Sequence, residues 1–550
     1  MNLFLVFQSF TKTERALFLG AGAIFVVSSI FWGSQYLYRN SVTIPIQSEE
    51  YIEGIIGQPT FINPVIAGAN DVDRDLSELL FSDLLDLADH YKASADGKTW
   101  NIILKNDIAW SDGKPLTSDD VIFTIETIQN IESRSPLFLT WQGVVVNRVS
   151  ELEIEFNLRV PYAFFAENLR DLKPIPKHIF GVIPAANIRL SNYNLEPVGS
   201  GPYVFVSYDK RKDGFITEYR LTTNKHYPSD KPFLYDFIVR FYPGTAEIIR
   251  AFNNRSINGF GDLNPNNLDA LKLSHQIVEL AIPRYYAVFI NQNSHPALKD
   301  ISVRTALNLS APTQEIIEKI FNNKALAIHQ PILPTMEGYD ATAEQPAAFS
   351  LEEATALLEQ EGWKITGDGV RAKKIGGQTV MLQFDMVIPQ IPFLTETAAL
   401  LQETWKKIGI LVNPIILNPT DITNEVIKTR NYQMLLFGNV LKINPDLFSF
   451  WHSTERFYPG LNLSLYDNKK ADSLLESIRK NLDDQSRLEE LSKLQTLISN
   501  DQPAVFLFSP AYLYVTSKNF GGLEKNMIAT ASERFEHVNQ WYVDTERVLK

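Results

Sequence analysis

Residues 110–124 read WSDGKPLTSDDVIFT, a stretch that predicts the end of a strand, a tight turn and the start of a helix. Asp112-Gly113 is a turn dipeptide, because glycine tolerates positive φ and an aspartate side chain can bond to the nearby backbone. Thr117 is expected to cap the helix, and the two acidic residues that follow Ser118 lie near the positive end of its dipole. Apolar residues then recur at helical spacing.

The amino-acid sequence of residues 110–124 closely resembles the signature of extracytoplasmic solute-binding proteins of the peptide/nickel ABC-importer family. Residues 199–205 (GSGPYVF) are similar to the family's G-T-G-P-Y-x-F, and residues 299–308 (KDISVRTALN) are similar to its D-x-x-V-R-x-A-L helix. Matching segments run from about residue 51 to residue 520. The resemblance therefore extends over nearly all of the chain that follows its first fifty residues.

The resemblance implies an α/β fold of the type II periplasmic-binding-protein kind, in which two lobes close about a hinge and a small extra lobe is inserted in the first. The first lobe would comprise residues 51–88, 199–285 and 516–550, the inserted small lobe residues 89–198, and the second lobe residues 286–515. A chain of 550 residues agrees with several lobes, because single cores stop growing beyond roughly 300 residues.

Several further elements follow from the spacing of apolar residues. Residues 152–158 alternate apolar and polar side chains, which predicts a strand with one buried face. Amphipathic helices are predicted in the second half of the chain at 351–361, 395–408, 469–480 and 483–498.

Residues 16–38 contain no charged residue and are long enough to span a bilayer, since a helix rises about 1.5 Å per residue and the hydrocarbon core is roughly 30 Å thick. Lys12 and Arg15 precede the segment, which favours a cytoplasmic N-terminus at residues 1–15. A cleavable signal peptide is the alternative, but its apolar region is usually shorter. We therefore predict a single-pass transmembrane anchor at 16–38, a linker at 39–50, and an extracytoplasmic location for residues 41–550.

The composition excludes several classes of protein. Lysine and arginine total 51 against 64 aspartates and glutamates, and this acidic balance argues against a nucleic-acid partner. The absence of cysteine excludes disulfides, thiolate metal sites, cysteine nucleophiles and the lipid-modified cysteine that tethers many relatives of the family. The eight histidines show no metal-binding spacing, and no phosphate-binding glycine loop is present. No cofactor, metal site or catalytic residue is predicted.

Six residues are candidate ligand contacts by position. Peptide-binding relatives carry a Trp and an Asp before the proline of the loop that here reads GNVLKINP at 438–445, and that Asp pairs with the α-amine of the peptide. An ungapped count puts these positions on Gly438 and Leu441, so the usual partner of a free amine is missing, although Asp446 could replace it if the loop is shifted. Core packing is the alternative for each aromatic candidate. The candidates are Tyr286, Asn291, Phe437, Asn439, Asp446 and Trp451.

The resemblance implies a membrane-anchored solute-binding component of an ABC importer. Its expected partners are a peptide or another small solute, an ABC permease with ATPase subunits, and the membrane through residues 16–38. An extracytoplasmic enzyme, or a ligand-sensing receptor that uses the same fold without transport, is the alternative.

Overall fold

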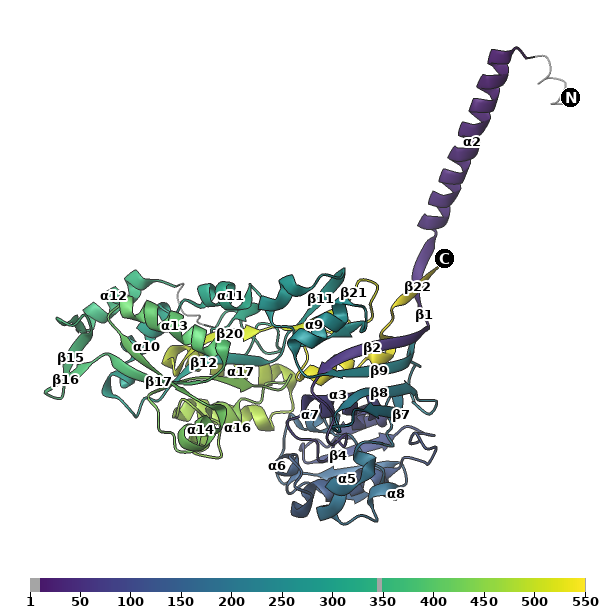
Figure 1. Ribbon diagram of the computed structural model, residues 1–550. Helices are drawn as coiled ribbons and strands as arrows, with labels where there is room; N and C mark the ends of the chain where they lie inside the picture. Colours follow the sequence, from purple (N-terminus) through teal and green to yellow (C-terminus); the bar gives the residue numbers. More distant parts are fainter. Residues whose placement is uncertain (1–9, 344–348, 550) are drawn as a thin grey trace.

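The computed structural model describes residues 10–343 and 349–549 (Figure 1). Residues 1–9 of the predicted cytoplasmic segment, residues 344–348 of the predicted second lobe, and Lys550 lie outside the described residues. Three larger sheets build the body of the molecule. We call the part around the seven-stranded sheet the first lobe, the part around the four-stranded sheet the small lobe, and the part around the six-stranded sheet the second lobe.

The N-terminal helix α2 (Lys12–Arg39) stands apart from the body (Figure 1). Thr11 and Glu14 form a capping box at its start, which satisfies free backbone N–H groups there. No residue of this fully described helix is buried, and its exposed side chains include Leu17, Phe25 and Trp32. Within the described residues it is the one helix that is long and apolar enough to cross a membrane.

A two-stranded ribbon joins α2 to the body. β1 (Ser41–Ile46) pairs antiparallel with β22 (Asp544–Leu549), in a register that runs from Ser41 opposite Leu549 to Ile46 opposite Asp544. The segment predicted to be a linker at 39–50 therefore contains β1 and the start of β2. The end of the described chain returns to the base of the helix (Figure 1).

The sheet of the first lobe has the strand order β11-β21-β10-β2-β9-β8-β7. The central strand β2 runs parallel to β9 and to β10, and its residues Tyr51 and Glu53 are fully buried. Helices α3 (Asp71–Leu80) and α9 (Thr245–Asn253) belong to this lobe. The strand bounds are β2 (Ser48–Ile56), β7 (Tyr203–Lys210), β8 (Ile216–Thr223), β9 (Leu234–Tyr242), β10 (Gly259–Phe260), β11 (His275–Leu280) and β21 (Tyr512–Ser517).

Arg534 is almost completely buried in the first lobe, where it is held by two carboxylates. Its guanidinium donates to both oxygens of Asp75, at 2.9 and 2.7 Å, and to Glu53 at 3.3 Å. The hydroxyl of Tyr514 donates to Glu53 at 2.7 Å. A buried charge is stable only when it is paired and hydrogen-bonded, so these residues stabilise one another.

The small lobe contains the sheet β3-β4-β6-β5 and helix α5 (Ser118–Gln129). The turn predicted at Gly113 is present, with φ of 85°, and Thr117 and Asp120 form the capping box of α5. The strand predicted at 152–158 is β6, whose burial alternates. The other bounds are β3 (Ala88–Ala93), β4 (Thr99–Leu104), β5 (Val145–Arg148) and β6 (Glu153–Asn157). One continuous apolar core joins this lobe to the first lobe.

The second lobe is built on the sheet β13-β20-β12-β19-β17-β18, which has apolar clusters on both faces. A three-stranded sheet of β14 (Lys364–Ile365), β15 (Arg371–Ile375) and β16 (Gln378–Met381) lies at its far end (Figure 1). The strand bounds are β12 (Arg284–Ile290), β13 (Ala325–Ala327), β17 (Gln383–Pro389), β18 (Leu411–Leu417), β19 (Met434–Val440) and β20 (Ala504–Pro510). The helix bounds are α10 (Ile301–Leu309), α11 (Thr313–Phe321), α12 (Leu351–Gln360), α13 (Pro392–Lys407), α16 (Lys469–Lys480) and α17 (Asp484–Asp501).

The chain crosses between the two larger sheets at two places. Residues 281–283 connect β11 to β12, and Ala511 connects β20 to β21. The two crossings lie side by side, since Leu280 pairs with Tyr512 in one sheet and Tyr286 pairs with Phe508 in the other. Two short adjacent connections of this kind are the geometry of a hinge.

Candidate functional site

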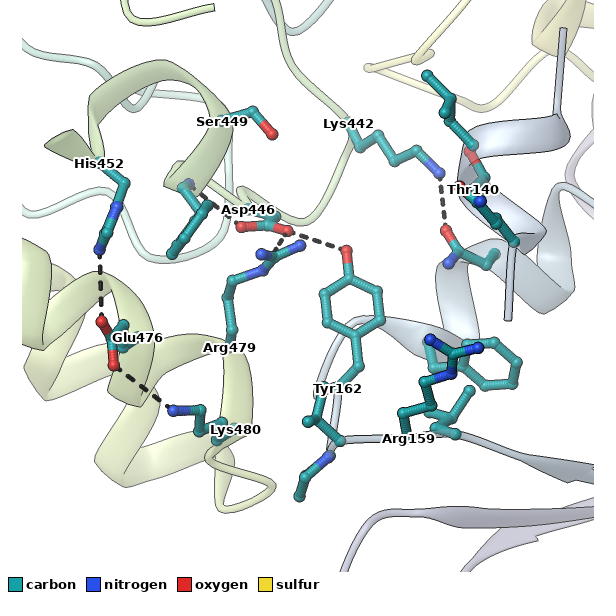
Figure 2. Close-up of a pocket in the computed structure, with 18 of the residues that line it drawn as sticks. Thr140, Arg159, Tyr162, Lys442, Asp446, Ser449, His452, Glu476, Arg479 and Lys480 are labelled. Carbon is teal, nitrogen blue, oxygen red and sulfur yellow. Dashed lines mark hydrogen bonds and ion pairs between the residues drawn. The ribbon is translucent and has the colours of Figure 1, made fainter. Parts of the chain in front are cut away.

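A cavity of about 880 Å³ lies between the small lobe and the second lobe. The small lobe supplies lining residues between positions 139 and 168, and the second lobe supplies lining residues between positions 440 and 480 (Figure 2). Small-molecule sites in proteins commonly enclose roughly 300–1,000 Å³. The cavity therefore has the size of a ligand site, and both walls would contact the same ligand.

The cavity is bordered by exposed apolar side chains from both lobes. Leu139 and Val160 of the small lobe are 77% and 61% exposed, and Val440 and Leu461 of the second lobe are 58% and 45% exposed. Removing apolar surface from water is favourable. A ligand with apolar groups would cover these four side chains, and this would favour its binding between the lobes.

Asp446 is held by donors from both sides of the cavity (Figure 2). The hydroxyl of Tyr162 donates to its Oδ2 at 2.9 Å, and Nε of Arg479 lies 3.1 Å from the same oxygen. The backbone N–H of Phe448 donates to Oδ1 at 3.2 Å. Burial and then the negative charge of Asp446 raise the pKa of Tyr162, so this phenol stays protonated and continues to donate.

Arg479 packs between two aromatic rings of opposite walls. Its guanidinium carbon lies 5.1 Å from the ring centre of Tyr162 and 4.4 Å from that of Phe448. Phe448 in turn stacks on His452 with the ring centres 4.1 Å apart. Cation–π contacts of this kind are attractive, particularly where water is excluded. Through these contacts, Tyr162 of the small lobe is linked to Arg479 and Phe448 of the second lobe.

The loop at 440–446 contacts the small lobe through alternate residues. Lys442 Nζ lies 2.6 Å from Asp171 and donates to Asn168 at 3.2 Å. Asn444 donates to Glu167 at 2.6 Å, and Asp446 accepts from Tyr162 as described above. The loop is thus joined to one segment of the small lobe at three points.

The other charged residues of the cavity differ in whether they have partners. Glu476 lies 3.5 Å from His452 Nε2 and 3.6 Å from Lys480 Nζ. Arg159 lines the opposite wall and is exposed. Among residues 10–343 and 349–549, none forms a hydrogen bond or an ion pair with its guanidinium.

Of the six residues predicted from the sequence, Asp446 lines this cavity and the other five do not. Trp451 is buried, with its ring centre 5.9 Å from that of Phe506, and Phe437 packs at the edge of the same cluster. Asn439 is buried and donates to the hydroxyl of Tyr285 at 2.9 Å.

The remaining two candidates lie on β12 and beyond its end. Asn291 is buried and donates to the carbonyl of Tyr432 at 2.9 Å. Tyr286 is half-buried, with its ring centre 5.1 Å from that of Phe393. The structure therefore does not bring the six candidates together in one place.

Sequence reasoning did not single out most of the charged and polar residues that line the cavity, among them Arg159, Tyr162, Lys442 and Arg479. The resemblance implies two lobes that close about a hinge and assigns the small lobe no part in the site. Tyr162 and Asp446 are 284 positions apart, and no local pattern relates such positions. The Pro-Tyr pair at the end of a predicted strand is the one local signal that could have drawn attention to Tyr162.

Two large mixed sheets joined by two adjacent crossings, with a cavity between lobes, define a solute-binding protein of the periplasmic type. Residues 85–457 match the model described as bacterial extracellular solute-binding proteins, family 5 Middle. The chain belongs to this family.

Known proteins of similar sequence and structure agree with this assignment. The oligopeptide-binding protein AppA of Bacillus subtilis is 26% identical over 505 residues, with 88% of this chain and 90% of AppA covered. The probable D,D-dipeptide-binding periplasmic protein DdpA of Escherichia coli is 25% identical, with 80% and 82% covered. The ABC transporter substrate-binding protein CtaP of Listeria monocytogenes has a similar fold, with a TM-score of 0.76, 24% identity, and 90% and 99% of the two chains covered.

Proposed function

We propose that this protein is the membrane-anchored, extracytoplasmic solute-binding component of an ABC importer, and that its solute is a peptide. The cavity between the small and second lobes is the observation that carries the proposal, because a ligand there would touch both lobes at once. A ligand that contacts both lobes stabilises the closed arrangement over the open one. The closed form would then deliver the peptide to a permease with ATPase subunits.

The names of the relatives favour a peptide over other solutes. AppA of Bacillus subtilis is named as an oligopeptide-binding protein, and its structure with a nonapeptide has a TM-score of 0.68 to this chain, with 24% identity and 91% and 100% of the two chains covered. The apolar border of the cavity suits peptide side chains.

The names of the relatives support binding, and the N-terminal helix supports attachment to the membrane. The relatives are named as binding proteins of transporters and not as enzymes. The apolar helix α2, none of whose residues is buried, supports an anchor that holds the body outside the cytoplasm.

The proposal is tested by native mass spectrometry of the full-length protein purified in detergent, followed by denaturing release of bound molecules. A retained set of peptides, or a thermal shift with pools of di- to pentapeptides, is the expected result. An empty protein that shows no thermal shift with these pools would overturn peptide binding. Turnover of the peptides during incubation would favour an enzyme instead.

A further inference from the structure

Arg159 differs from the other lysines and arginines that line the cavity. Arg479 lies 3.1 Å from Asp446, Lys480 lies 3.6 Å from Glu476, and Lys442 lies 2.6 Å from Asp171. Arg159 forms no hydrogen bond or ion pair within the described parts of the chain, and it is labelled on the small-lobe wall in Figure 2. Among the lysines and arginines of the described cavity lining, Arg159 is therefore the residue whose positive charge has no carboxylate partner and is available to a ligand.

The backbone beside Arg159 leaves room for its guanidinium. A Cβ atom added to Gly143 would lie 3.2 Å from both Cζ and Nε of Arg159. Gly143 also has φ of 82°, a conformation that other residues rarely adopt. Glycine at this position thus allows the guanidinium to lie flat against the chain at the wall of the cavity.

The two carboxylates that line the described cavity, those of Asp446 and Glu476, already have neighbouring donors or cations. Asp446 has contacts with Tyr162, Arg479 and the N–H of Phe448, and Glu476 lies 3.6 Å from Lys480 Nζ and 3.5 Å from His452 Nε2. Leu441 of the same loop is buried and uncharged. A ligand ammonium group would share either carboxylate with a lysine or arginine that is already beside it, whereas a ligand carboxylate would meet Arg159 without a competing partner among the described residues.

We propose that the cavity binds its ligand by a carboxylate group at Arg159 and does not require a free α-amine. This inference rests on the proposed function and specifies its ligand as a peptide with a free C-terminal carboxylate. A guanidinium presents a planar fork of N–H donors that matches the two oxygens of a carboxylate, so the contact is directional as well as charged. Arg159 would then be a specificity-determining residue contributed by the small lobe.

The test compares one apolar tetrapeptide without acidic side chains in three forms: unmodified, N-acetylated and C-amidated. Binding to the full-length protein in detergent is measured by isothermal titration calorimetry. N-acetylation is expected to change Kd by less than about threefold, and C-amidation is expected to weaken binding by about tenfold or more, the scale of one charge-assisted contact. A fourth peptide, amidated but with an internal glutamate, shows whether a side-chain carboxylate can replace the terminal one.

Arg159→Gln should abolish the difference between the free and amidated peptides, and Arg159→Lys should retain part of it. Arg148→Gln is the matched control, because Arg148 is an exposed arginine of the same lobe that pairs with Asp119 outside the cavity. Equal binding of the free and amidated peptides, or discrimination that survives in Arg159→Gln, would overturn the inference while peptide binding stands. If no form binds, the proposed function fails and the inference fails with it.

Discussion

Arg547, in the last strand of the chain, packs on Tyr38 at the end of the N-terminal helix. The guanidinium carbon lies 3.9 Å from the ring centre of Tyr38, and Nη2 donates to the Tyr38 carbonyl at 2.8 Å. The same side chain donates to the hydroxyl of Ser41 at 3.0 Å. A cation at this position also interacts favourably with the negative end of the helix dipole. These contacts link residues more than five hundred positions apart.

Arg547→Ala is expected to loosen the ribbon of β1 and β22 without unfolding the body. A two-stranded ribbon is marginally stable alone, and an exposed cation–π contact contributes about 0.5–1 kcal/mol. Limited proteolysis of the full-length protein in detergent should therefore cut faster between α2 and β2. Glu546→Ala is the control, since Glu546 is an exposed neighbour on the same strand. Equal cleavage rates in the two variants would contradict the role given to Arg547.

Tyr162→Phe is expected to weaken the contact between the small and second lobes that Tyr162 makes with Asp446. The change removes the hydroxyl that donates to Asp446 and leaves the ring beside Arg479. We expect a loss of about 0.5–1.5 kcal/mol in unfolding free energy, measured by denaturant titration. Tyr193→Phe is a matched control, because Tyr193 is exposed and packs on Phe180 outside the cavity. If both variants lose the same free energy, the hydrogen bond contributes nothing specific.

Arg534→Met is expected to destabilise the protein strongly. The change leaves Glu53 and Asp75 buried without their cationic partner, and breaking a buried ion pair in this way costs about 3–5 kcal/mol. The measurement is the unfolding free energy at neutral pH. A loss below about 1 kcal/mol would show that the two carboxylates find other compensation. Arg250→Met, at an exposed arginine of the same lobe, provides the comparison.

Glu53 is expected to make the protein less stable as the pH rises. Burial raises the pKa of Glu53 from 4.5 to about 7, against the opposing effect of Arg534. Between these two values the folded state binds more protons than the unfolded state, so the unfolding free energy falls as the pH rises from about 4.5 to about 7. Glu53→Gln should therefore flatten the pH dependence measured at pH 5.5 and pH 7.5. An unchanged slope, with exposed Glu49→Gln as reference, would contradict this assignment.

The intact mass of the membrane-bound protein distinguishes an anchor from a cleaved signal peptide. We expect α2 to be retained, because its apolar length matches a bilayer span and β1 follows it directly. Mass spectrometry of protein from the membrane fraction should then give a chain that includes residues 16–38. A mature N-terminus near Gln35, with the protein released from the membrane, would contradict this expectation.

Local patterns predicted much of the secondary structure. The turn and cap of 110–124 were identified from residue types whose backbone preferences are strong, and the helix predicted at 469–480 has the bounds of α16. The prediction at 395–408 began three residues late, because Pro392 occupies the first position of α13. The spacing of apolar residues predicts a helix correctly where one face of the helix is buried and the other is exposed to solvent.

The cavity could not be predicted in the same way. Asp446 was identified from its place in a loop, but its partner Tyr162 belongs to another lobe. Trp451 and Asn439 have the residue types of ligand contacts, and the structure shows them packed in the second lobe. Whether an aromatic or amide side chain faces a cavity or a core depends on how the lobes are arranged, and spacing along the chain does not encode that arrangement.

The shared core of the first and small lobes has a mechanical consequence if α2 is a membrane anchor. The ribbon enters this unit through β2 and leaves it after Trp541, whose ring centre lies 5.9 Å from that of Tyr51. Both attachments to the helix therefore belong to the same rigid unit. If the hinge at 281–283 and Ala511 bends, the first and small lobes keep their connection to the helix, and the second lobe changes its orientation relative to them. A membrane protein beside such an anchor would meet two lobes joined to the helix and a third lobe that moves relative to them.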